Sequence, residues 1–256
     1  MAAASDRAPP AAAPVGGERW ALFLDFDGTL AELADHPSAV SVPEHLPGTL
    51  CRLRVALGGA LALVSGRPLS ALDAFIGCGP NDGPLPAAGL HGLERRRGDG
   101  TVTRAPSNGG ELDRLREELQ AIGGRYPGVW LEDKGLSLAL HFRAVPHAGA
   151  ALRVFVQDRL RSLSGHELLE GKMVIELKPS AANKGAAIRA FMEESAFRGT
   201  IPVFAGDDIT DEDGFEAAEV LGGMAIKIGG GPSRARHGLP DVASLHRWLE
   251  TLECRL

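Results

Sequence analysis

Two aspartates, Asp25 and Asp27, follow an apolar run that begins at Trp20 and stand directly before Gly28 and Thr29. A short apolar run that ends in a glycine turn is typical of a strand buried on both faces of a parallel sheet. Side chains two positions apart in a strand lie on the same face, so the two carboxylates would repel each other. A divalent cation would relieve that repulsion. The pattern favours a cation site over turn or helix-cap carboxylates.

The ligands that Mg²⁺ prefers indicate that a cation site of this kind serves phosphate transfer. Mg²⁺ prefers one or two carboxylates together with water and the phosphate oxygens of a substrate. A carboxylate at such a site can attack phosphorus, and the aspartyl-phosphate that forms divides one slow displacement into two easier ones. Hydrolysis of a phosphate monoester needs an acceleration of up to about 10²¹-fold, so a nucleophile, a metal and positive charge are expected together.

The motif Asp-x-Asp-Gly-Thr at 25–29 resembles the first motif of the haloacid dehalogenase superfamily of phosphatases. This resemblance implies that Asp25 is the nucleophile and that Asp27 is the general acid/base. Asp27 would protonate the leaving oxygen of the substrate and then activate the water that opens the aspartyl-phosphate. The resemblance also implies that Mg²⁺ is the cofactor, held by Asp25 and Asp27 among other residues.

A second apolar run at 60–64 leads directly into Ser65 and Arg67, and a helical pattern over 43–57 separates it from the first strand. Strand, helix and strand form a right-handed parallel unit, in which the carboxyl ends of both strands lie at one edge of the sheet. We therefore expect Ser65 and Arg67 beside Asp25. Ser65 matches the second motif of the superfamily, which holds a phosphoryl oxygen, although a capping role for the following helix is also open.

The later part of the chain supplies matches to the two remaining motifs. Lys184 precedes a helical pattern, a place that the helix dipole disfavours for a cation. It matches the third motif, in which the lysine neutralises the nucleophile and the phosphoryl group. The run 201–205 then ends in acidic residues that match the fourth motif. We expect Asp207 to bind Mg²⁺ directly and Asp208 or Asp211 to act through water.

His91 lies between Gly89 and Gly92, within a segment at 87–94 that resembles another strand end. Its position close to the backbone favours a contact with substrate, and a solvated turn histidine is the alternative.

Between the second and third motifs the pattern changes to helix, two strands, helix and two strands. This order predicts a small antiparallel sheet with helices on one face, which forms a separate module. Alternate residues of a strand share a face, so one face of this sheet is apolar. The other face carries Glu132, Lys134, His141, Arg143, Glu176 and Lys178. Such a face suits sugar hydroxyl groups, and a solvated surface would show the same pattern.

The inserted module and the segments 131–135, 140–143 and 206–212 resemble the trehalose-6-phosphate phosphatases. The resemblance implies a small-molecule substrate, trehalose 6-phosphate, whose distal glucose is clasped by Glu132, Lys134, Arg143 and Glu176. The chain departs from the family pattern at Lys178, where arginine is more common, and at Asn183, where an acid is more common. The alternatives are a phosphatase for another sugar phosphate, such as sucrose 6-phosphate, and a non-catalytic sensor of sugar phosphates.

Composition excludes several other classes of protein. The chain has 256 residues, 44% of them hydrophobic, and a net charge of −6, which gives no general attraction to nucleic acid or to anionic membranes. No apolar run approaches the length of a membrane span. The three cysteines, Cys51, Cys78 and Cys254, lack metal-type spacing, which favours free thiols in a reducing cytoplasm. We expect a monomeric cytoplasmic enzyme.

The predicted fold class is α/β. We expect a disordered tail at 1–17, because it is rich in Ala and Pro and lacks the pattern of a signal peptide. A Rossmann-like core, with a parallel sheet and helices on both faces, is predicted at 18–105 and 180–256. The inserted α/β cap domain is predicted at 106–179.

Overall fold

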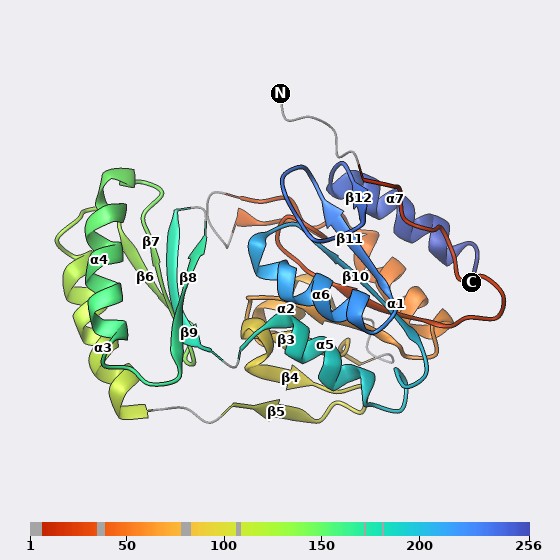
Figure 1. The fold of residues 1–256 in the computed structure, drawn as a ribbon, viewed down its shortest axis with the longest axis horizontal. Helices are drawn as coiled ribbons and strands as arrows, with labels where there is room; N and C mark the ends of the chain where they lie inside the picture. Colours follow the sequence, from red (N-terminus) through yellow and green to blue (C-terminus); the bar gives the residue numbers. More distant parts are fainter. Residues whose placement is uncertain (1–6, 35–38, 78–82, 106–108, 172, 181) are drawn as a thin grey trace. The chain divides into compact units, whose positions relative to one another are not determined.

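The structure is a computed structural model that describes residues 7–34, 39–77, 83–105, 109–171, 173–180 and 182–256. The chain divides into two compact units (Figure 1). The first unit joins Met1–Thr103 to Asn183–Leu256, and the second is Arg104–Ala182. The predicted cap segment, 106–179, lies within the second unit.

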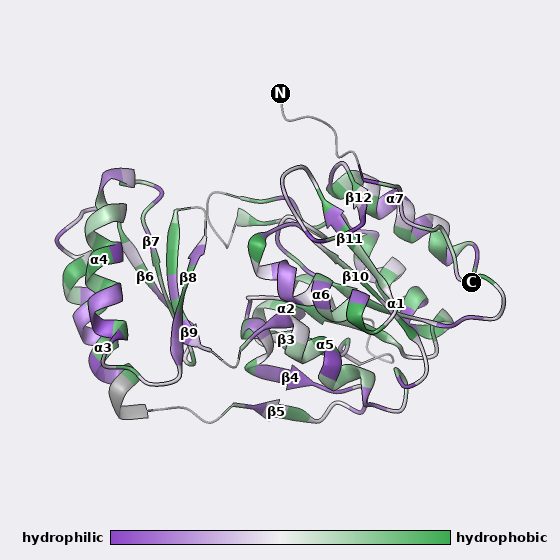
Figure 2. Ribbon diagram, in the orientation of Figure 1, coloured by the Kyte–Doolittle hydropathy of each residue, from purple (hydrophilic) through white to green (hydrophobic). Residues whose placement is uncertain are grey.

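The first unit is built on an eight-stranded sheet, in the order β12-β11-β10-β1-β2-β3-β4-β5. Its strands are β1 (Trp20–Leu24), β2 (Leu61–Val64), β3 (Ala87–Gly89), β4 (Glu94–Arg96), β5 (Val102–Arg104), β10 (Ile201–Gly206), β11 (Met224–Ile228) and β12 (His237–Leu239). The pairings from β12 to β3 are parallel, and β4 returns antiparallel to β3. Figure 2 colours β4 as hydrophilic, and its residues are Glu94, Arg95 and Arg96.

Helices cover both faces of this sheet, because the central strands are apolar on both sides. The helices are α1 (Leu46–Ala56), α2 (Leu69–Phe75), α5 (Lys184–Met192), α6 (Glu212–Val220) and α7 (Val242–Glu253). Leu22 of β1 packs in a cluster with α1, α2 and α7, whereas its neighbour Phe23 packs with α5 and α6. Phe23 is fully buried, and its ring lies 5.4 Å from that of Phe197. These observations confirm the predicted α/β fold class with a parallel sheet.

The register of the central strands brings their carboxyl ends together. Leu24 pairs with Ala205 on one side and with Leu63 on the other. The chain therefore leaves β1, β2 and β10 at the same edge, where the backbone N–H of Asp25 donates to the Ala205 carbonyl at 3.0 Å. Gly28 follows with a φ of +77°, a conformation that favours glycine, and turns the chain away from the sheet.

The second unit has a four-stranded antiparallel sheet in the order β6-β7-β9-β8. Its elements are α3 (Gly109–Gly123), β6 (Trp130–Asp133), β7 (Leu138–His141), α4 (Gly149–Leu160), β8 (His166–Gly171) and β9 (Val174–Pro179). Leu138, Leu140, Ile175 and Leu177 pack with the two helices in one apolar cluster. The alternation in the sequence therefore gives the correct buried face.

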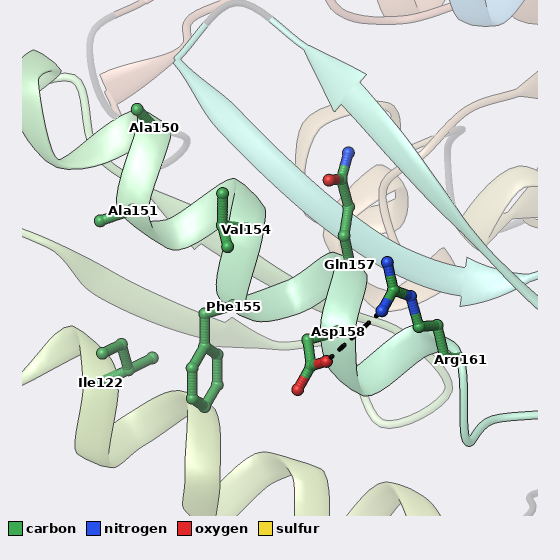
Figure 3. A pocket seen from close by; sticks show the side chains of 8 residues that line it. All are labelled: Ile122, Ala150, Ala151, Val154, Phe155, Gln157, Asp158 and Arg161. Carbon is green, nitrogen blue, oxygen red and sulfur yellow. Dashed lines mark ion pairs between the residues drawn. The ribbon is translucent and has the colours of Figure 1, made fainter.

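Figure 3 shows a hollow on the helical side of this unit, formed by Ile122 of α3 and several residues of α4. Apolar side chains such as Ala150, Val154 and Phe155 line most of it, and Asp158 and Arg161 form an ion pair at one end. The hollow lies in the helical layer, away from the polar face of the sheet. It contains none of the predicted site residues.

The N-terminal segment, predicted as a disordered tail at 1–17, makes contacts with the first unit at Arg7 and Ala11. The Arg7 guanidinium donates to the carbonyls of Ala235 at 3.0 Å and Gly231 at 2.7 Å. The indole N–H of Trp248 donates to Ala11 at 2.8 Å. Composition could not reveal these contacts, because their partners are more than 200 positions away in the sequence. Residues 1–6 lie outside the described residues.

The expectation of free thiols is wrong in part. Cys51 is disulfide-bonded, Cys254 is free and exposed, and Cys78 lies outside the described residues. Within the described ranges, no helix has the length and apolar character needed to cross a membrane.

Candidate active site

Lys184 joins two buried aspartates at the carboxyl edge of the first unit's sheet. Its ammonium group donates to Oδ1 of Asp25 at 2.7 Å and to Oδ1 of Asp211 at 2.7 Å. Lys184 stands in the first turn of α5, and Asn183 caps that helix by accepting from the backbone N–H of Ala186 at 2.6 Å. The cap fixes the start of the helix, so the lysine is aimed at the end of β1.

Burial and charge strongly perturb this group of side chains. Burial raises the pKa of Asp25 well above its usual range, and the charges of Asp211 and Asp207 add to this, although Lys184 opposes it. Burial would lower the pKa of Lys184, but the charges of Asp211 and Asp25 outweigh it and raise the pKa above its usual value. The lysine is therefore a permanent cation between the two carboxylates.

Asp25, Asp207 and Asp211 could share one metal ion. Each offers a carboxylate oxygen, and these oxygens lie within 4.8 Å of one another. Burial raises the pKa of Asp207 to about 7, and the nearby charges of Asp211 and Asp208 contribute. The carboxylate of Asp207 packs against Gly28, where a Cβ atom would overlap it. The glycine of the first motif thus leaves room for the carboxylate of the fourth.

The residues of this edge fit Mg²⁺. Three carboxylates lie near two ammonium groups, those of Lys184 and Lys227, so the cluster keeps an excess of negative charge in a largely buried place. Such an excess is costly unless a cation compensates it. Oxygen donors with room for a substrate phosphate are the set that Mg²⁺ prefers.

Asp208, predicted to belong to the metal set, is not among the three carboxylates that lie together, and its role stays a prediction. Asp208 is exposed, and its side chain accepts from the backbone N–H of Ile209 at 2.6 Å, which caps the short helix η4 (Ile209–Asp211). Asp211 is the other residue that was predicted to act on the metal through water. Its side chain is fully buried. Its Oδ2 accepts from the backbone N–H groups of Asp207 and Asp208, both at 2.9 Å. Its position at the end of η4 turns it back toward Lys184.

Arg67 and Asp27 form a bidentate ion pair. The guanidinium donates through Nε to Oδ2 at 2.7 Å and through Nη2 to Oδ1 at 2.7 Å. The guanidinium carbon also lies 5.2 Å from the ring centre of Phe26 and 5.1 Å from that of Phe75. Arg67 was predicted to bind substrate, and this stays a prediction; the contact described here orients the predicted general acid/base.

Ser65 is buried at the end of β2, and its Oγ accepts from the backbone N–H of Arg67 at 3.2 Å. The N-cap of α2 is Pro68, and no side chain caps this helix. Ser65 therefore does not cap α2, but it shapes the turn that places Arg67. Its role toward a phosphoryl oxygen stays a prediction.

His91 is buried, with 6% of its surface exposed, so it is not a solvated turn residue. It sits in the short helix η2 (Leu90–Gly92) at a φ of +57°, a strained conformation for histidine. Its imidazole lies against Gly66, where a Cβ atom would come within 2.7 Å of Nε2. The structure brings His91 next to the second motif, and its contact with substrate stays a prediction.

Lys227 is a buried residue of this site that the sequence analysis missed. It lies near the carboxyl end of β11, and its ammonium group donates to the backbone carbonyls of Asp207 and Ile228. Its charge also lowers the pKa of Asp207, against the larger effect of burial. A lysine inside an apolar strand was the available signal, because such a residue is rarely buried without a partner.

In the second unit, the polar sheet face brings Glu132, Lys134 and Glu176 together. Lys134 donates to Oε2 of Glu176 at 2.9 Å, and the hydroxyl of Ser137 donates to Oε1 at 2.7 Å. Glu132 lies 2.8 Å from Nε2 of His141. Arg143 follows β7 and is exposed.

The arrangement of the strands and helices is that found in haloacid dehalogenase-like hydrolases. The structure is similar to a haloacid dehalogenase-like hydrolase from Bacteroides thetaiotaomicron, with a TM-score of 0.66 over 91% of this chain and 98% of that one at 15% identity. It is also similar to the C-terminal domain of Candida albicans trehalose-6-phosphate phosphatase, with a TM-score of 0.81 over 93% and 94% of the two chains at 18% identity. At these identities the likeness shows the fold.

The sequence shows the family to which the chain belongs. Residues 23–240 match the model of the trehalose-phosphatase family, and the chain belongs to this family. It is 40% identical to the trehalose-6-phosphate phosphatase of Escherichia coli K12, over 93% of this chain and 88% of that protein. It is 43% identical to a probable trehalose-phosphate phosphatase of Sinorhizobium fredii, over 89% and 84% of the two chains.

Proposed function

We propose that this chain hydrolyses trehalose 6-phosphate to trehalose and inorganic phosphate, with Mg²⁺ as cofactor and an aspartyl-phosphate on Asp25 as intermediate. The observation that carries the proposal is the ammonium group of Lys184 between Asp25 and Asp211. This contact places a fixed positive charge beside the carboxylate that would act as the nucleophile. The chain that carries it belongs to the trehalose-phosphatase family. Asp25, Asp207 and Asp211 would hold Mg²⁺, which supplies positive charge to the phosphoryl oxygens when it is bound.

In the first step, an oxygen of Asp25 attacks phosphorus and the bond from phosphorus to the sugar oxygen breaks. Oδ1 of Asp25 is held by Lys184, so Oδ2 is the oxygen left to attack. Asp27 gives a proton to the leaving oxygen, and trehalose departs. Lys184 neutralises the charge that the phosphoryl group brings into the buried site.

In the second step, Asp27 takes a proton from water, and the hydroxide attacks phosphorus. The bond to Asp25 breaks, phosphate leaves and the carboxylate is restored. Arg67 holds both oxygens of Asp27, so this contact must loosen while Asp27 exchanges its proton. The pairing sets the direction from which Asp27 approaches the leaving oxygen.

The test is phosphate release from a panel of sugar phosphates that includes trehalose 6-phosphate and sucrose 6-phosphate, with Mg²⁺ and again with a chelator. Selective, Mg²⁺-dependent turnover of trehalose 6-phosphate is the expected result. Equal turnover of all members would support the core chemistry and contradict the proposed substrate. No turnover of any member would favour the sensor.

A further inference from the structure

A stacked pair of aromatic side chains lies on the polar sheet face of the second unit. Trp130 of β6 and His141 of β7 are direct partners in the strand register. Their ring centres are 4.0 Å apart, and their planes differ by 5°. Contact over a whole ring face leaves the imidazole little freedom to turn. Trp130 thus sets the plane of the histidine ring.

The histidine in turn holds one oxygen of Glu132. Nε2 of His141 lies 2.8 Å from Oε2 of Glu132, so the plane of the imidazole determines where this carboxylate points. The side chain of Glu132 is 26% exposed. Among the described residues, none donates a hydrogen bond to its Oε1. That oxygen keeps its full capacity to accept from a ligand.

The ionisation of Glu132 supports the same role. Burial would raise its pKa, but the hydrogen bond with His141 and the charges of Lys134 and His141 outweigh burial, and the pKa lies below its usual value. An ionised carboxylate accepts stronger hydrogen bonds from hydroxyl groups than a neutral acid does.

The other glutamate on this face, Glu176, differs from Glu132 in its hydrogen bonds and in its exposure. Both oxygens of Glu176 already accept hydrogen bonds, one from Lys134 and one from Ser137. Its side chain is only 7% exposed. Glu176 is therefore placed to orient the ammonium group of Lys134.

We propose that Trp130 and His141 are positioning residues that aim Glu132 at a hydroxyl group of the sugar. The resemblance to the family implies that Glu132 contacts the sugar, and the new element is that the stacked pair positions this carboxylate. The inference rests on the proposed function, since it concerns recognition of the sugar part of the same substrate. A site built to pair with a hydroxyl group discriminates strongly against compounds that lack it.

The experiment compares kcat/KM for trehalose 6-phosphate with kcat/KM for p-nitrophenyl phosphate, which has no sugar. Replacing Trp130 by alanine should lower the ratio of the two values about tenfold, mainly through a higher KM for the sugar phosphate. Trp130→Phe should restore most of the ratio, because a phenyl ring also stacks on the imidazole. Val154→Ala, on the helical side of the unit, is the matched control and should leave the ratio unchanged.

A double-mutant cycle then tests whether Trp130 acts through Glu132. If it does, Trp130→Ala should cost almost nothing further in a Glu132→Ala background, because the group that it positions is gone. Fully additive losses would overturn the inference. A Trp130→Phe variant as impaired as Trp130→Ala would also overturn it, since stacking would then not be the cause.

These experiments distinguish a failure of this inference from a failure of the proposed function. A wild-type chain that prefers p-nitrophenyl phosphate and does not turn over trehalose 6-phosphate would overturn the proposed substrate and this inference together. Selective wild-type turnover with additive losses in the cycle would overturn the inference alone.

Discussion

Both carboxylate oxygens of Asp27 are held by Arg67, at 2.7 Å each, while the guanidinium lies against the rings of Phe26 and Phe75. The two phenylalanines restrict the guanidinium, and the guanidinium restricts the carboxylate. A residue that must give a proton to the leaving sugar oxygen and then take one from water needs such a defined approach. Arg67 therefore orients Asp27 and is also a candidate for binding substrate.

Arg67→Lys separates these two roles. A lysine keeps the charge but cannot make two parallel hydrogen bonds, so Asp27 should lose its orientation. We expect kcat to fall by about tenfold to a hundredfold for both trehalose 6-phosphate and p-nitrophenyl phosphate, with little change in KM. Arg161→Lys, at an exposed position of the second unit, is the control and should have no effect. A higher KM with an unchanged kcat would show that Arg67 binds substrate instead.

Asp25→Asn should abolish phosphate release, because an amide cannot form the aspartyl-phosphate. The fold should persist, since the amide oxygen can still accept from Lys184, and circular dichroism would show this. Acid quenching during turnover of a radiolabelled substrate should leave label on the wild-type chain and none on the variant. Near-normal turnover by Asp25→Asn would rule out this nucleophile.

Gly28→Ala tests the fit between the first and fourth motifs. The new methyl group would overlap the carboxylate of Asp207, and the φ of +77° adds backbone strain. We expect the Mg²⁺ concentration needed for half-maximal activity to rise about tenfold or more, since Asp207 is displaced. Gly58→Ala is the matched control, because Gly58 has a φ of +63° but no atom within 4 Å of the added methyl group. It should cost about 1 kcal/mol of stability and no activity. Equal Mg²⁺ dependence in both variants would contradict the explanation.

Asp207 links metal binding to pH. Its pKa of about 7 in the folded chain exceeds the usual value, so the metal-free folded chain binds more protons than the unfolded chain between about pH 4 and pH 7. The contribution of this group to stability is present below that range and is lost as the pH rises through about 7. Mg²⁺ competes with the proton, so stabilisation by Mg²⁺ should grow between about pH 6 and pH 8.

Thermal melts with Mg²⁺ and with a chelator would measure this effect at several pH values. At a hundred times its Kd, Mg²⁺ should stabilise the chain by about 2.7 kcal/mol. In Asp207→Asn the dependence of this stabilisation on pH should shrink. A variant that keeps the wild-type pH dependence would show that another group titrates.

Local patterns in the sequence were sufficient to predict much of the fold and part of the candidate site. The apolar run before Asp25 defined a buried strand, and the parity of β7 and β9 gave the buried face of the second unit, because burial follows directly from alternation. The choice between Asp208 and Asp211 could not be made in this way. It depends on the short helix η4, which turns one side chain outward and the other inward.

Contacts between residues far apart in the sequence also could not be predicted from the sequence. Lys227 reaches the carbonyl of Asp207 from the neighbouring strand, and Arg67 reaches Asp27 from the next strand on the other side. Neither partner can be chosen from spacing, because each pairing depends on strand register and on the rotamers of long side chains. The same holds for Arg7, whose partners lie near the other end of the chain.

The N-terminal segment also has a consequence for association between molecules. Ala8 bridges to His237, and its carbonyl accepts from the backbone N–H of Gly238 at 3.0 Å, so it covers part of β12, the outermost strand of the eight-stranded sheet. An uncovered outer strand offers unpaired backbone groups to a strand of another chain. Removing or displacing this segment would therefore favour aggregation before it affected catalysis, and an N-terminal purification tag is best separated from it by a spacer.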